Sequence, residues 1–299
     1  MRQSPVYIIG DTPLAFALAV KLRAEEQNAC ILGTANPERF VMPFTLRNDV
    51  SLQKQSATLP CLPFMHDEPK LVIIAARPQN LRADLTYFSY AKTTDCPVVS
   101  FCHTPNLSYV SDILQRPILS AYFDGYVSLR GDNTVAVQGN TGTLTLTINE
   151  NHIHYQTLQN LLAKTYFKLN FNPYGLQNFW EFFTPYAACS LFSIKHGSNI
   201  REVAKFPELR QTLNTIVEEI IAAAPQEVKL NREQIISGIY STPKDYTYPA
   251  LTEFKNKLGG ELMFIADTLR AQAQIKALKL PACENIINTA LHRILSSVE

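Results

Sequence analysis

The chain of 299 residues is 46% hydrophobic, and its charged residues leave a formal net charge of +1 at pH 7. Because its basic residues are scattered and no apolar stretch is long enough to span a bilayer, the composition argues against nucleic-acid and membrane partners. Residues 1–5 lead directly into an apolar run without a signal-peptide pattern, so we expect a cytoplasmic protein.

The first half of the sequence alternates between short apolar runs and helical periodicity. The apolar runs are residues 6–9, 29–32, 71–76 and 97–101. Residues 15–22 and 81–92 carry apolar side chains at helical spacing. Apolar strands that alternate with helices indicate a parallel sheet buried on both faces, with right-handed crossovers. We therefore predict an α/β, Rossmann-type dinucleotide-binding domain at residues 1–150.

Residues 118–147 show a different pattern, in which short strands alternate with turns that contain glycine. The predicted strands are residues 126–129, 134–137 and 143–147, and the predicted turns are residues 131–133 and 139–142. This pattern predicts antiparallel hairpins added to the parallel sheet.

The second half has mostly helical periodicity. The predicted helices are residues 158–167, 209–224, 232–240, 261–280 and 282–294. The polar residues 149–152 mark the predicted domain boundary, so residues 151–299 form an all-helical domain for substrate binding or dimerisation. The aromatic residues between 179 and 186 are predicted to be helix-packing core, with a substrate pocket or a homodimer contact as the alternatives.

The six cysteines contain no C-x-x-C pair and lie mostly in apolar surroundings. We expect buried free thiols, as is usual in a reducing compartment, and we expect neither a disulfide framework nor a metal site.

The loop after the first predicted strand resembles a dinucleotide-binding loop, which carries glycine at its first, third and sixth positions. Here these positions hold Gly10, Thr12 and Ala15. Thr12 replaces the glycine that lets the backbone approach a pyrophosphate, but Thr12 is suited to cap a helix that has Pro13 at its first position. A phosphate site at this helix N-terminus and a plain strand-to-helix turn are the two interpretations. The candidate cofactor-binding residues here are Gly10, Asp11, Thr12, Pro13 and Leu14.

The end of the second predicted strand bears on cofactor preference. An acidic residue there favours NAD, whereas a nearby arginine accommodates the extra phosphate of NADP. Residues 33–36 contain no acid, and Arg39 follows them. We therefore expect NADP with NAD as the alternative, unless Arg39 is an ordinary surface residue.

Four segments together resemble the ketopantoate reductase family, the NADPH-dependent reductases of 2-dehydropantoate. The first is the Gly10 loop, and the second is residues 71–79, which resemble a family strand that ends in a lysine with a glutamine nearby. The third is residues 164–173, which resemble a family helix with a Lys, an Asn and an Asn-Pro step. The fourth is residues 249–253 with residues 260–262, which resemble the Ser-Met-x-x-Asp and Thr-Glu-Ile segments of the family, and Leu280-Pro281 matches its closing proline.

The resemblance implies roles for several residues. Lys164 matches the catalytic lysine of the family and Glu261 its active-site glutamate. Asn172 matches the asparagine of the Asn-Pro step, and Arg77 falls where the family has a lysine near the cofactor. We expect Asn172 and Lys168 to contact the substrate.

His103 follows the fourth predicted strand, on the side where ligands bind in open α/β sheets. We expect it near the cofactor, with a hydrogen-bonded structural histidine as the alternative.

Lys164 and Lys168 are four residues apart and would share one face of a helix, where each charge lowers the pKa of the other. Such a lysine is suited to protonate a nascent alkoxide while hydride passes from a nicotinamide to a 2-oxo carbon. Glu261 would hold the ammonium group of Lys164. The alternative is a solvated pair of lysines and a glutamate that only stabilises the first turn of its helix.

Besides Thr12, four sites depart from the pattern of the family, and at the first of them Lys168 stands where the family has an asparagine. Pro249 replaces a serine that binds the substrate carboxylate, Phe182 replaces an asparagine, and His103-Thr104 replaces Asn-Gly. Because these polar partners are missing, ketopantoate itself is disfavoured as the substrate.

The sequence therefore predicts an NAD(P)H-dependent reductase of a small 2-oxo acid. One alternative is a non-catalytic relative that binds a nucleotide or another ligand as a sensor or an assembly subunit. Another is a dehydrogenase that oxidises an amino or hydroxy acid.

Overall fold

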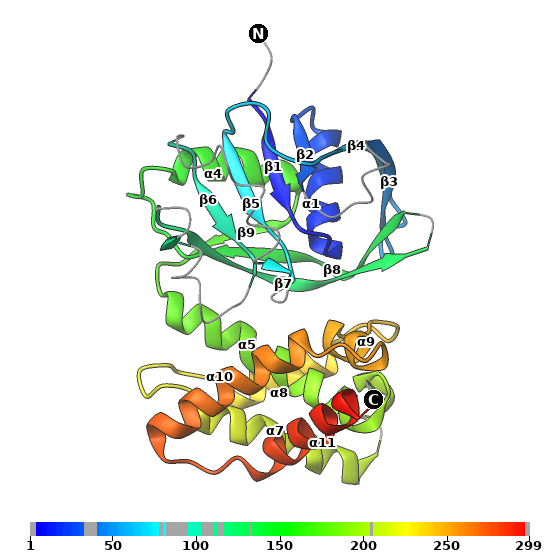
Figure 1. The fold of residues 1–299 in the computed structure, drawn as a ribbon, viewed down its shortest axis with the longest axis vertical. Coiled ribbons are helices and arrows are strands. Elements are labelled where there is room, and N and C mark those ends of the chain that lie inside the picture. Colours follow the sequence, from blue (N-terminus) through cyan, green and yellow to red (C-terminus); the bar gives the residue numbers. More distant parts are fainter. Residues whose placement is uncertain are drawn as a thin grey trace. The chain divides into compact units, whose positions relative to one another are not determined.

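The computed structural model describes residues 4–32, 41–77, 80–81, 95–102, 111–112, 116–131, 133–203 and 206–296. The chain divides into two compact units, Met1–Gly175 and Leu176–Glu299. Figure 1 shows both units and labels elements of each.

Short apolar strands form the centre of the sheet in the first unit. In sheet order they are β2 (Ala29–Leu32), β1 (Val6–Ile9), β5 (Leu71–Ile74) and β6 (Val98–Ser100), and every pairing among them is parallel. Ile8 and Ile73 point into one core, whereas Tyr7 and Val72 point into a second core on the other face. Burial on both faces explains why these strands are continuous apolar runs. The predicted parallel sheet is confirmed.

The sheet extends beyond these strands and closes on itself. β4 (Lys54–Leu62) pairs in parallel with β2 and antiparallel with β3 (Val41–Asn48). On the other side β7 (Leu119–Arg130) pairs in parallel with β6 and antiparallel with β8 (Thr134–Leu146). A parallel pairing of β3 with β8 joins the two ends, so the added hairpins close the sheet like a barrel.

The predicted turn at residues 139–142 was wrong, because β8 continues through these residues. The ring of Phe123 explains the glycines in this region. A Cβ atom added to Gly125 or Gly142 would stand 2.5 or 2.6 Å from that ring. Glycine therefore makes room for a packed aromatic side chain, and the pairing of β7 with β8 shifts register between Asp124 and Tyr126.

Helix α1 (Pro13–Ala24) packs inside the curve of this sheet (Figure 1). Leu18 and Leu22 of α1 belong to the same core as Phe44 of β3 and Val135 of β8. Because the sheet surrounds it, α1 is apolar on most sides.

Two further elements belong to the first unit and move the boundary between the units. Helix α4 (Tyr155–Leu162) buries its leucines in the core that contains α1, and β9 (Lys168–Phe171) pairs in parallel with β8. The predicted boundary at residues 149–152 was therefore wrong, and the division falls between Gly175 and Leu176.

In the described residues of the second unit the secondary structure is helical, as predicted. The helices are α5 (Gly175–His196), α6 (Ile200–Val203), α7 (Pro207–Ala223), α8 (Arg232–Tyr240), α9 (Pro249–Lys255), α10 (Gly260–Lys276) and α11 (Pro281–Leu295). Of the aromatic residues between 179 and 186, Trp180 and Phe183 are buried core, as predicted, and Phe183 contacts Trp180 and Phe264 edge to face. Phe179 and Phe182 are only half-buried.

All six cysteines are buried and free, as the sequence predicted. Among the described residues no group of three or more His, Cys, Asp and Glu side chains is arranged to hold a metal ion. No helix in the described part of the chain is long and apolar enough to cross a membrane.

Candidate functional site

Gly10 follows β1 in a turn that leaves no room for a side chain. Its φ of +119° favours glycine, and an added Cβ would stand 2.5 Å from the carbonyl oxygen of Ala75 and 2.6 Å from the Cα of Ala76. Both alanines directly follow β5, which is the parallel neighbour of β1. Gly10 therefore allows the backbones at the ends of two parallel strands to approach closely, which is the role of the first glycine in a dinucleotide loop.

Thr12 caps helix α1 and also binds the end of β5. Its Oγ1 donates to the carbonyl oxygen of Ala75 at 2.5 Å and accepts from the N–H of Ala15 at 3.2 Å. Pro13 occupies the first turn of α1, so the predicted cap with a following proline is confirmed. The threonine side chain thus folds back onto the protein.

This cap limits the amides that the loop offers to a phosphate. Pro13 has no N–H, the N–H of Ala15 binds the Thr12 side chain, and the N–H of Phe16 donates to the Thr12 carbonyl oxygen at 3.3 Å. No described residue accepts a hydrogen bond from the N–H of Leu14. A phosphate at this helix N-terminus would therefore find the helix dipole and one open amide of the first turn.

A cation and a carboxylate flank the same turn. Nε of Arg77 lies 3.8 Å from Oδ1 of Asp11, and the two side chains are 38% and 39% exposed. Oδ1 of Asp11 is itself buried and has no hydrogen-bond partner among the described residues. Arg77 follows β5, so its charge stands beside the Gly10 loop.

The structure brings together six of the candidate cofactor-binding residues: Gly10, Asp11, Thr12, Pro13, Leu14 and Arg77. Arg39 and His103 lie outside the described residues.

Lys164 lies at the opposite end of α1 from this turn. Burial and the nearby charge of Lys164 lower the pKa of Lys70, which immediately precedes β5. The hydroxyl of Tyr166 donates to the carboxylate of Glu25, the C-cap of α1, at 2.7 Å. Since α1 has 12 residues and is about 18 Å long, the structure does not bring Lys164 to the Gly10 loop.

The prediction that Lys164 and Lys168 lie on one helix was wrong. After α4, Lys164 lies in a single 3-10 turn, η2 (Ala163–Thr165), and Tyr166 adopts a left-handed φ of +56°. Strand β9 then begins at Lys168, which is exposed. The two lysines therefore share no helical face.

Asn172 lies at the same edge of the sheet as the Gly10 loop. Its N–H donates to the carbonyl oxygen of Leu146, and the N–H of the next residue, Thr147, donates to the carbonyl oxygen of Ser120. Ser120 pairs with Ser100, the last residue of β6. Because the ends of β1, β5 and β6 form one edge, these bonds place Asn172 along that edge, and the strand β9 separates it from Lys168.

Glu261 is held by two side chains within the second unit. The hydroxyl of Tyr186 donates to Oε2 of Glu261 at 2.6 Å. The N–H of Glu261 donates to Oε2 of the buried Glu253 at 2.9 Å, which supplies α10 with a cap that Gly259 does not provide. Burial, followed by the charge of Glu261 and its hydrogen bond, raises the pKa of Tyr186 well above its ordinary value.

Sequence reasoning missed Tyr186 and Glu253 as partners of Glu261. Tyr186 lies in the aromatic run that was interpreted only as core, although a buried tyrosine hydroxyl usually needs a polar partner. The two departures from the family pattern in this unit have structural roles. Phe182 stacks on Tyr186 with ring centroids 5.5 Å apart, and Pro249 begins α9.

Lys164 belongs to the first unit and Glu261 to the second.

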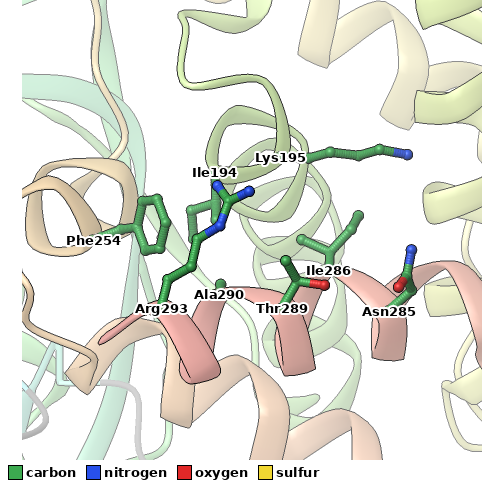
Figure 2. Close-up of a pocket in the computed structure, with 8 residues that line it drawn as sticks. All are labelled: Ile194, Lys195, Phe254, Asn285, Ile286, Thr289, Ala290 and Arg293. Atoms are coloured by element: carbon green, nitrogen blue, oxygen red, sulfur yellow. The ribbon is translucent and has the colours of Figure 1, made fainter. Parts of the chain in front are cut away.

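A groove in the second unit is lined by residues of α5, α9 and α11 (Figure 2). Its lining combines apolar side chains, among them Ile194 and Ile286, with the cations Lys195 and Arg293. Arg293 reaches from α11 toward α5, whereas the side chain of Lys195 extends away from Arg293. Both cations stand in the last turn of a helix, where the helix dipole favours positive charge, so the groove needs no anionic ligand to explain them.

No protein-family model matches the chain, and no curated protein sequence is similar to it. Solved structures with the same fold are nevertheless numerous. A D-mandelate dehydrogenase with NADH and anilino(oxo)acetate is 16% identical with a TM-score of 0.80, over 98% of this chain and 99% of that one. A ketopantoate reductase from Ralstonia eutropha is 14% identical with a TM-score of 0.81, over 99% of this chain and 100% of that one.

A dimeric ketopantoate reductase from Staphylococcus aureus is 13% identical with a TM-score of 0.78, over 97% of this chain and 99% of that one. The chain therefore has the fold of ketopantoate reductases and of a related nicotinamide-dependent dehydrogenase over nearly its whole length.

Proposed function

We propose that this chain is an NAD(P)H-dependent reductase of a small 2-oxo acid. The observation that carries the proposal is the Gly10 turn, which packs against Ala75 with the cation of Arg77 beside it. This turn lies at the carboxyl ends of parallel strands, where α/β sheets bind ligands. The structural neighbours support the reaction class, because one of them contains NADH together with anilino(oxo)acetate.

The residues of the loop fit a diphosphate with a reduced set of donors. Gly10 lets the backbone bend sharply, the N–H of Leu14 donates to no described residue, and Arg77 supplies a positive charge. These residues would hold the diphosphate of a nicotinamide dinucleotide, and the cofactor would supply the hydride. We keep NADP as the expected cofactor, with Arg39 as the proposed contact to its additional phosphate.

Asn172 and Glu261 stay proposed site residues, each argued within its own unit. Asn172 stands along the loop edge of the sheet. Glu261 presents a carboxylate that accepts from the hydroxyl of Tyr186, while its backbone N–H donates to Glu253. Lys168 stays a proposed contact to the substrate, and His103 stays a proposed contact to the cofactor. Lys164 lies near the end of α1 that is far from the Gly10 loop, so we assign it no contact to the cofactor.

The test combines cofactor binding with turnover. NADPH and NADH are titrated by nucleotide fluorescence, and a panel of small 2-oxo acids is then screened for oxidation of the bound reductant. We expect R77A to weaken dinucleotide binding about tenfold, because it removes the cation at the loop. R232A, which removes an exposed ion-paired arginine on α8, is the control and should leave binding unchanged. Failure of the wild-type protein to bind either dinucleotide would contradict the proposal.

A second candidate is a non-catalytic relative that binds a nucleotide or another ligand as a sensor or an assembly subunit. The hydrogen bond from Ala15 N–H to Thr12 favours it, since this bond and Pro13 remove two first-turn donors. Dinucleotide binding without turnover on any oxo acid, and without oxidation of the corresponding hydroxy acids, would favour this candidate over the reductase.

A further inference from the structure

The Gly10 loop holds a negative charge where a diphosphate would bind. Asp11 directly follows Gly10 and directly precedes Thr12, the N-cap of α1. Most dinucleotide loops rely on open amides at this point, but here Leu14 is the one first-turn residue of α1 whose N–H no described residue accepts. A ligand diphosphate therefore depends more heavily on the side chains around the turn.

Arg77 is the cation placed to meet that diphosphate, and Asp11 already engages it. Their side chains form an ion pair at 3.8 Å, and both are more than one-third exposed, so the pair can separate. Oδ1 of Asp11 is buried and lacks a hydrogen-bond donor among the described residues, so the carboxylate is held at the turn without full compensation.

We propose that Asp11 competes with the dinucleotide diphosphate for Arg77 and so lowers the affinity of the Gly10 loop for a dinucleotide. The inference rests on the proposed nicotinamide site, and it adds a repulsive element to that site. Two effects act together. The carboxylate repels the incoming phosphates directly, and it neutralises the guanidinium that would attract them.

A gain in affinity is the sharpest test, because a damaged fold does not tighten binding. Dissociation constants of NADPH and NADH are measured for the wild type, D11N and D11A at low and at high salt. We expect both variants to bind about tenfold more tightly at low salt. The gain should shrink at high salt, since half-exposed charges are screened. E68Q is the control, because it removes the same formal charge from an exposed position on the segment that precedes β5.

The competition for Arg77 gives a second readout. In an R77A background the gain from D11N should be smaller than in the wild type, because no guanidinium remains to be released. Unchanged or weaker binding by D11N, or an equal gain from E68Q, would overturn the inference.

The inference and the proposed function fail in different ways. Turnover of 2-oxo acids by the wild type tests the reductase, whereas the ratio of dissociation constants between D11N and the wild type tests Asp11. Binding gained by D11N in a protein without turnover would support Asp11 and contradict the reductase. Turnover by the wild type with no gain in D11N would do the reverse.

Discussion

The hydroxyl of Thr12 donates to the carbonyl oxygen of Ala75 at 2.5 Å, so a single side chain links the start of α1 to the end of β5. The hydroxyl oxygen of Thr12 also accepts from the N–H of Ala15. Thr12 therefore stabilises the turn and withdraws an amide from the ligand side of it. Stability and dinucleotide affinity should respond to changes at this residue in opposite directions.

Replacing Thr12 separates these two effects. We expect T12A to lower the free energy of unfolding by about 1 to 2 kcal/mol, because an N-cap and a partly buried hydrogen bond are lost. T12G should also be less stable, but it should bind NADPH more tightly, because the N–H of Ala15 becomes open and the loop regains its middle glycine. Urea unfolding and fluorescence titration measure the two quantities, and T12S, which keeps the hydroxyl, is the control. Weaker NADPH binding by T12G would mean that this amide does not face the diphosphate.

Gly10 should tolerate no side chain. G10A places a methyl group against backbone atoms of Ala75 and Ala76 at a φ of +119°, so we expect a loss of about 3 kcal/mol or more in unfolding free energy. Gly238 in α8 is a matched control, because an added Cβ there would contact nothing within 4 Å. G238A should stabilise the protein by about 0.5 to 1 kcal/mol. Equal stability of G10A and the wild type would show that β5 does not lie behind the turn.

The central strands could be predicted from sequence because they are buried on both faces. β1 and β2 have the bounds that their apolar runs indicated. β3 and β4 were missed, because each contains a proline and exposed polar positions, and their pairing depends on β2 and β8, which lie far away in sequence. Non-local pairing also hid β9.

The contrast between local patterns and long-range pairing also explains which parts of the candidate site could be predicted from the sequence. The Gly10 loop and its cap are a local strand-turn-helix feature, so their residues could be identified from spacing alone. Lys164 was matched to the catalytic lysine of the ketopantoate reductase family by its spacing along an assumed helix. The left-handed turn at Tyr166 and the pairing of β9 with β8 interrupt that helix. The link between Tyr186 and Glu261 joins residues 75 positions apart, so no local pattern contained it.

Lys164 should be dispensable for cofactor binding. Because it lies near Lys70 rather than near the Gly10 loop, we expect K164A to bind NADPH within about twofold of the wild type. Removal of its charge should also raise the pKa of Lys70, since that charge contributes to lowering it. Fluorescence titration and turnover measurements check the first expectation, with R77A as the variant that should lose binding. Intact NADPH binding with abolished turnover in K164A would restore Lys164 as the proton donor.

Tyr186 should stabilise the protein at neutral pH and lose this effect in alkali. Y186F removes the donor to Glu261, so we expect a loss of about 1 to 3 kcal/mol in unfolding free energy at pH 7. The folded state raises the pKa of Tyr186, so its contribution is complete below the ordinary tyrosine value of about 10. Above that pH the unfolded chain releases the proton first, and the contribution declines. The difference between wild type and Y186F should therefore shrink as the pH rises past 10.

Urea unfolding at several pH values measures this difference directly. Y174F is the control, because Tyr174 is 72% exposed and the loss of its hydroxyl should change stability by less than about 0.5 kcal/mol. If Glu261 contacts the substrate, as we propose, Y186F should also raise the KM for the oxo acid while the dissociation constant of NADPH stays unchanged. If the difference between wild type and Y186F were constant from pH 7 to pH 11, folding would not raise the pKa of Tyr186, and the prediction would be wrong.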